Sequence, residues 1–69
     1  MNYYNIYGFR FGEPVKLIFA AIPKSNFKIA FNTAAELQYE ITQIIKIGNH
    51  SNFFIDEDVT DEIKSEFKF

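Results

Sequence analysis

The stretch YYNIYGFRFGEPVKLIFAAI, residues 3–22, decides the fold, because two strand-like patterns flank a short break. Residues 3–11 are rich in aromatics that favour strands, and they alternate between two sides. One side carries Tyr3, Tyr7, Phe9 and Phe11, and the other carries Tyr4, Ile6, Gly8 and Arg10. Pro14 cannot donate to a strand ladder and Gly12 tolerates positive φ, so residues 12–14 predict a turn. Residues 15–22 then predict a second strand that pairs with the first as a hairpin, and its run is apolar on both faces, which is typical of a central strand.

The middle of the chain combines a strand pattern with a helix signal. Residues 27–31 place Phe27, Ile29 and Phe31 at alternate positions, which predicts a third strand. Thr33 and Glu36 have the spacing of a capping box, and an apolar stripe at helical spacing follows. We therefore expect a helix over residues 34–47, although the β-branched residues of 41–47 also permit a strand there.

Two shorter patterns lie near the C-terminal end of the chain. Residues 53–56 predict a short strand, and residues 62–69 alternate charged with apolar side chains, which favours a half-buried edge strand. The alternative for this last segment is a helix that uses Val59, Ile63 and Phe67. We therefore predict one α+β domain, residues 1–69, in which an antiparallel sheet carries one amphipathic helix on one face. The expected order is strand-strand-strand-helix-strand-strand.

One helix can cover only one face of such a sheet. The side chains expected beneath the helix are Phe9, Phe11, Leu17, Phe19, Phe27, Ile29, Phe31, Ile63 and Phe67. Those expected on the uncovered face are Tyr4, Ile6, Arg10, Ile18, Ile22 and Phe54. An apolar patch of this kind on a small protein indicates an interaction surface. The alternative is that the long stems of Arg10, Lys16 and Lys28 lie over it.

Charge is divided unevenly along the chain. The net charge is −2, but residues 1–35 carry +3 and residues 36–69 carry −5. The acidic side chains that we expect to form a partner-binding surface are Glu36, Glu40, Asp56, Glu57, Asp58, Asp61 and Glu62. Such a surface would attract a protein with a basic surface, and the alternative is a merely solvated acidic loop.

The residues needed for catalysis or for a metal site are few. The chain has no cysteine and one histidine, His50, so disulfides, zinc ribbons and thiol nucleophiles are excluded. Asp56, Asp58 and Thr60 have the spacing of a calcium-binding loop, but Asp61 and Phe67 stand where that loop needs Gly and Glu. We expect no enzyme activity and no cofactor. The start of the chain lacks the features of a signal peptide, and its longest apolar run, residues 17–22, is too short for a membrane helix, so we expect a cytoplasmic protein.

These observations favour a small protein-binding module that acts as an inhibitor or regulator. Its length, acidity and abundance of residues with A/T-rich codons are typical of phage or mobile-element proteins that block host proteins. The alternative is a binder of single-stranded nucleic acid, which the net negative charge disfavours. Its candidate residues are Tyr3, Tyr4, Tyr7, Arg10, Lys16 and Lys28. A homo-oligomer that closes the uncovered face on a second copy is compatible with either function.

Overall fold

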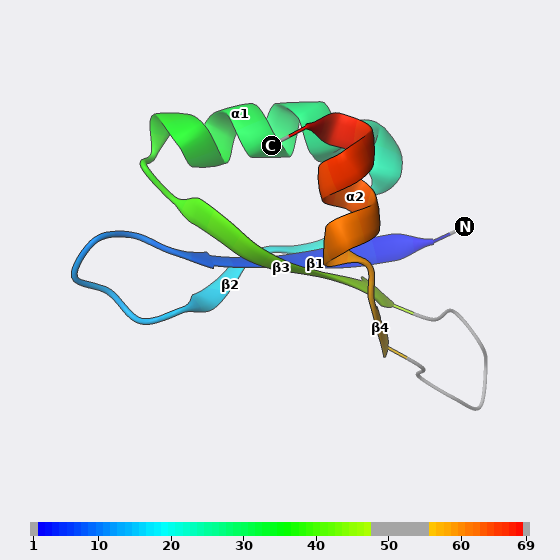
Figure 1. The fold of residues 1–69 in the computed structure, drawn as a ribbon, viewed down its shortest axis with the longest axis horizontal. Helices are drawn as coiled ribbons and strands as arrows, with labels where there is room; N and C mark the ends of the chain where they lie inside the picture. Colours follow the sequence, from blue (N-terminus) through cyan, green and yellow to red (C-terminus); the bar gives the residue numbers. More distant parts are fainter. Residues whose placement is uncertain (1, 48–55, 69) are drawn as a thin grey trace.

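A four-stranded antiparallel sheet carries both helices of the described chain on one of its faces (Figure 1). The computed structural model describes residues 2–47 and 56–68. In chain order the elements are β1 (Tyr3–Phe9), β2 (Lys16–Pro23), a 3-10 turn η1 (Lys24–Asn26), α1 (Phe27–Glu36), β3 (Glu40–Ile47), β4 (Asp56–Asp58) and α2 (Thr60–Phe67). The strand order across the sheet is β2-β1-β3-β4. The predicted α+β class with an antiparallel sheet is confirmed, although several segments form elements other than those expected.

The hairpin predicted from residues 3–22 is present, but β2 lies at the edge of the sheet and β1 is central. After α1 the chain returns as β3 and pairs with the other side of β1, from Tyr3 opposite Ile47 to Phe9 opposite Glu40. The expectation of a central position for β2 is therefore wrong. Its apolar content has another cause, because Phe19 and Ile22 pack against the core from the edge.

Residues 27–31 form the first half of α1 instead of the expected strand. The helical spacing of Phe27, Ala30 and Ala34 places all three side chains in the core, and all three are buried. Ile29, which an alternating strand would bury beside Phe27, is instead 69% exposed. The helical period therefore outweighs the alternating pattern in this segment.

The helix expected over residues 34–47 is also wrong, because α1 ends at Glu36 and residues 40–47 are a strand. Gln38 adopts a left-handed conformation with φ of 65°, and the Tyr39 N–H donates to the Ala34 carbonyl oxygen at 2.8 Å. This arrangement is typical of a helix C-terminus. Thr33 lies inside the helix and does not cap it. The strand left open for residues 41–47 is confirmed, and pairing with β1 buries Ile44 completely.

The last segment forms helix α2, the alternative to the expected edge strand. Val59 and Ile63 are buried one helical turn apart, and Phe67 packs against the same core. Lys68 ends the helix in a left-handed conformation with φ of 56°. Of the strand expected over residues 53–56, only Asp56 lies within the described residues, where it begins β4.

Phe27 occupies the centre of the core between the sheet and the two helices. Its ring lies 4.9 Å from the Tyr4 ring, 5.3 Å from Phe31 and 5.6 Å from Phe67, measured between centroids. The pairs with Tyr4 and Phe67 are edge-to-face and the pair with Phe31 is tilted. Aromatic pairs of this kind add to the stabilisation that burial provides. The buried apolar cluster consists of Tyr4, Ile6, Phe27, Ala30, Ile44, Val59 and Ile63. A single aromatic cluster thus holds α1 and α2 on the same face of the sheet.

The two sides of β1 are the reverse of those expected, whereas five other side chains expected beneath the helix do pack in or against the core: Phe19, Phe27, Phe31, Ile63 and Phe67. Tyr4, Ile6 and Gly8 of β1 are buried beneath the helices, so the intervening residues of β1 face the opposite way. A Cβ at Gly8 would clash with the Glu40 carbonyl oxygen and would lie 2.6 Å from Ile18 Cδ1, so only glycine fits on this side. Tyr3 and Tyr7 lie on the other side, where Tyr3 is exposed and Tyr7 is partly exposed.

Candidate protein-binding surfaces

The face of the sheet opposite the helices carries a row of large apolar side chains, here called the open face. Residues that pair across antiparallel strands point to the same side, so Tyr3 lies beside Ile47, and Tyr7 lies beside Leu17. Tyr3 is 37% exposed and Leu17 is 44% exposed. The open face consists of Tyr3, Tyr7, Phe9, Leu17, Ile45 and Ile47, and the same pairing places the polar side chains of Asn5 and Gln43 among them. None of the helices in the described residues covers it (Figure 1).

The residues predicted for an uncovered sheet face lie elsewhere. Tyr4 is 7% exposed and Ile6 is fully buried, so both belong to the core. Ile22 pairs with Tyr4 and packs against that core, and Ile18 lies close to Gly8 on the same covered side. Phe54 falls outside the described residues. An uncovered face therefore exists, but the sequence pattern assigned it to the wrong side chains.

Five of the predicted acidic residues gather where β4 leads into α2, and this set is here called the acidic edge. It consists of Asp56, Glu57, Asp58, Asp61 and Glu62, all of them exposed. Asp56 pairs with Ile47 and Asp58 with Ile45, so these two carboxylates lie along one margin of the open face. Asp61 and Glu62 occupy the first turn of α2, where the helix dipole favours negative charge. An open depression of about 770 Å³ includes Glu57, Asp58, Asp61 and Glu62 in its lining.

Asp58 also holds the start of α2 in place. One oxygen, Oδ1, accepts the Thr60 N–H at 2.9 Å and the Thr60 hydroxyl at 2.6 Å, and Oδ2 accepts the Gln43 amide at 3.1 Å. The hydrogen bonds from the Thr60 hydroxyl and N–H, followed by that from Gln43, lower the pKa of Asp58 from its ordinary value of 3.8. Asp58 is therefore charged at neutral pH and has a structural role as well as a place on the acidic edge.

The remaining two predicted acidic residues belong to other elements. Glu36 is the last residue of α1, and Glu40 is the first residue of β3 and pairs with Phe9 at the far end of β1. Neither belongs to β4 or α2. The seven acidic residues named from the sequence therefore form one cluster of five and a separate pair.

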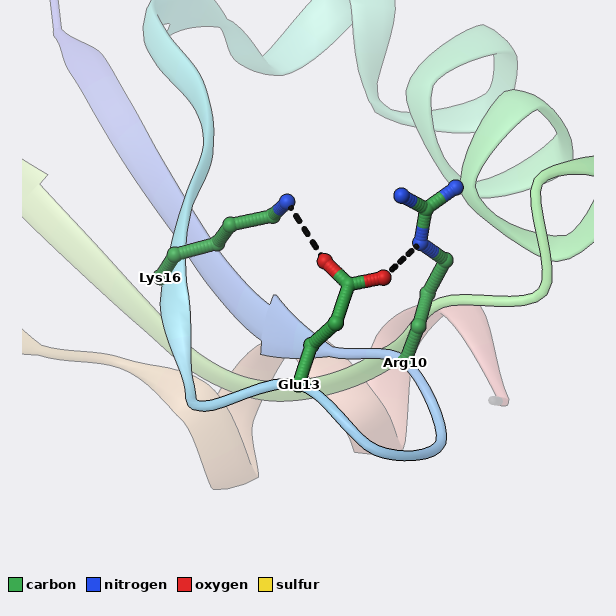
Figure 2. A network of polar contacts seen from close by, with 3 residues as sticks. All are labelled: Arg10, Glu13 and Lys16. Carbon is green, nitrogen blue, oxygen red and sulfur yellow. Dashed lines mark hydrogen bonds and ion pairs between the residues drawn. The ribbon is translucent and has the colours of Figure 1, made fainter.

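A cluster of polar side chains at the β1–β2 hairpin was not foreseen. Figure 2 shows Glu13 between two cations: its Oε2 lies 2.8 Å from Arg10 Nε and its Oε1 lies 3.0 Å from Lys16 Nζ. Arg10 also lies over the Tyr39 ring at 4.6 Å, and Lys16 at 5.2 Å. The spacing of three residues between Arg10, Glu13 and Lys16 is the signal that sequence reasoning missed.

The same contacts shift the pKa values of the three hairpin groups. Hydrogen bonds from Lys16 and then Arg10 lower the pKa of Glu13, and the bond to Glu13 raises that of Arg10. A hydrogen bond with Tyr39, followed by that with Glu13, raises the pKa of Lys16. All three groups are therefore charged at neutral pH, and Glu13 neutralises one of the two positive charges, so the cluster carries a net charge of +1.

Two further findings concern ligands and membranes. In residues 2–47 and 56–68, no group of three or more His, Cys, Asp or Glu side chains is placed to hold a metal ion. Within the same residues, neither helix has the length and apolar content needed to cross a membrane.

No protein-family model, curated protein or solved structure matches this chain. Its function is therefore inferred from the surfaces described above.

Proposed function

We propose that this chain is a non-enzymatic protein-binding domain, whose open face and acidic edge dock on a partner with a basic surface. The observation that carries the proposal is the position of both helices on one face, which leaves Tyr3, Leu17 and their neighbours exposed on the other. A group of exposed apolar side chains bordered by charged groups is typical of a protein interface.

The charges beside the open face define the chemistry of the partner. Asp56 and Asp58 share the side of Ile47 and Ile45, so an apolar surface bordered by lysine or arginine side chains would complement this region. Such charges speed association and select among partners, whereas the buried apolar centre supplies most of the affinity. The role that fits a domain of this size is inhibition or regulation in the cytoplasm, as performed by small phage and mobile-element proteins that block host proteins.

The test uses the full chain as bait in a lysate of its host cell, followed by binding measurements with the purified partner. Exchanging Asp56 and Asp61 for lysine reverses two charges of the acidic edge, one of them beside the open face, and leaves Asp58, with its structural role, intact. The matched control, Glu36→Lys with Glu40→Lys, makes the same change of net charge elsewhere. We expect the first variant to lose at least tenfold in affinity and the control to bind like the wild type. Equal binding by both variants, or the absence of any specific partner, would overturn the proposal.

A second candidate function is the binding of single-stranded nucleic acid. One observation favours it: Tyr3, Tyr7 and Phe9 alternate along β1 on the open face, where bases could stack at about 1–3 kcal/mol each. Tyr4 is buried and cannot contribute. The nearby carboxylates of Asp56 and Asp58 would repel phosphate groups, so we favour the protein partner. Titration of a labelled oligonucleotide at low salt separates the two functions, since a stacking platform would bind at micromolar concentration.

A further inference from the structure

Phe11 is a fully exposed aromatic side chain at the tip of the β1–β2 hairpin, with a relative exposure of 103%. The loop that carries it has a defined shape. The Glu13 N–H donates to the Arg10 carbonyl oxygen at 2.9 Å, and Gly12 adopts a φ of 83° that favours glycine. The ion pairs from Glu13 to Arg10 and Lys16 connect the two ends of the loop (Figure 2). Phe11 is therefore presented on an ordered projection.

A hollow of about 370 Å³ lies between α1, α2 and the start of β3. Its apolar lining comes from Phe31, Ala34 and Ala35 of α1 and from Ile41 of β3. Tyr39, Glu40 and Lys64 contribute the polar part of the lining. This composition suits an aromatic ring, because most small-molecule and side-chain pockets combine an apolar lining with a few polar groups.

The projection and the hollow are neighbours on the surface. Tyr39 lines the hollow, and its ring also lies beneath the Arg10 guanidinium and the Lys16 ammonium group at the base of the hairpin. A single patch of this protein thus contains both an exposed aromatic side chain and an apolar hollow. Such a patch is self-complementary, because a twofold axis between the two features brings each one against its counterpart.

We propose that the chain forms a twofold dimer in which Phe11 of each copy enters the hollow of the other. An aromatic side chain buries about 150–250 Å², so two of them remain well short of the roughly 1,200 Å² typical of stable interfaces. The dimer is therefore weak and depends on concentration. The dimer uses neither the open face nor the acidic edge, so its test is independent of the test of the proposed function.

Sedimentation equilibrium of the full chain from about 10 μM to about 1 mM tests the dimer, since dissociation constants in this range belong to small interfaces. We expect the mass to rise from 8.1 kDa toward twice that value with concentration. Phe11→Asp should remain at 8.1 kDa throughout, and its fold should be unchanged because Phe11 is fully exposed. The control Ile29→Asp removes another exposed apolar side chain, 69% exposed on α1, and should dimerise like the wild type.

Cross-linking then distinguishes this dimer from others, because the chain has no cysteine of its own. A mixture of Phe11→Cys and Ala35→Cys copies should form mixed disulfides on oxidation, whereas a mixture of Phe11→Cys and Asp61→Cys copies should not. A wild type that stays monomeric at every concentration overturns the proposal. The proposal is also overturned if Phe11→Asp still dimerises, or if the two mixtures cross-link equally.

Discussion

The two faces of the sheet come from the same strands, yet among residues 2–47 and 56–68 helices cover only one of them. On the covered face Ile6 and Ile44 are completely buried, whereas on the open face Tyr3 is 37% exposed and Leu17 is 44% exposed. Both faces carry large apolar side chains of β1, with Tyr4 and Ile6 on the covered side and Tyr3, Tyr7 and Phe9 on the open side. The difference therefore lies in the helices and not in the strands: α1 and α2 supply one layer of cover for two apolar faces.

This difference assigns separate tasks to the two faces. The covered face contains the aromatic cluster around Phe27, whose burial holds both helices on the sheet. A chain of 69 residues has a stability of roughly 3–10 kcal/mol, so it cannot lose much of that cluster and remain folded. The open face contributes less to stability and can exchange water for a partner. Substitutions on the two faces should therefore separate folding from binding.

The largest expected difference in the free energy of unfolding is between alanine variants of two neighbouring isoleucines of β3, whose side chains point to opposite faces of the sheet. Ile44 is fully buried, so Ile44→Ala should destabilise the fold by about 2–5 kcal/mol through lost burial and the cavity left behind. Ile45 lies on the open face and is partly exposed, and Ile45→Ala should cost about 1 kcal/mol. Urea denaturation of the two variants measures the difference. Similar losses would mean that the open face is covered in solution.

The sequence predicts the hairpin and the one-sided cover, because both follow from strong local signals. Gly12 and Pro14 fix a turn between two apolar runs, and the chain is too short to cover both faces of a sheet. The acidic edge is also predictable, since its five residues are close together in sequence. These features depend little on how the rest of the chain packs.

The wrong predictions of secondary structure come from segments whose local sequence pattern fits both a helix and a strand. Residues 27–31 satisfy both an alternating and a helical pattern, and packing of Phe27 against Tyr4 and Phe67 decides for the helix. Residues 41–47 depend similarly on pairing with β1. The open face was assigned to the wrong residues of β1 because both sides of that strand are apolar. Gly8 was the available signal, since a residue without a side chain marks the side where Glu40 approaches most closely.

A smaller difference in the free energy of unfolding is expected between valine variants of two threonines, one buried and one exposed. The Thr60 hydroxyl accepts the Ile44 N–H at 2.9 Å and donates to Asp58, and Thr60 is 9% exposed. Thr60→Val leaves that N–H without its acceptor in a buried site, which should cost about 1–3 kcal/mol. Thr60→Ser keeps the hydroxyl and should cost less. Thr42 donates to the Tyr7 carbonyl oxygen at 3.4 Å from an exposed position, so Thr42→Val should change the free energy of unfolding by no more than about 0.5 kcal/mol. Equal losses for Thr60→Val and Thr42→Val would contradict a buried role for Thr60.

The smallest expected change in stability comes from removing the charge of Asp58, which lies at the margin of the open face and holds the start of α2. Its pKa is lower in the folded state than its ordinary value of 3.8, so its charge stabilises the fold above that value. This contribution is lost as the pH falls through the lower, folded pKa. Asp58→Asn should therefore be less stable than the wild type between about pH 5 and pH 7, and the difference should diminish below about pH 4. Glu13, whose pKa is also lowered, contributes with the same sign, so urea denaturation of Glu13→Gln provides the comparison. A difference between the wild type and Asp58→Asn that stays constant with pH would show that the charge of Asp58 does not stabilise the junction between β4 and α2.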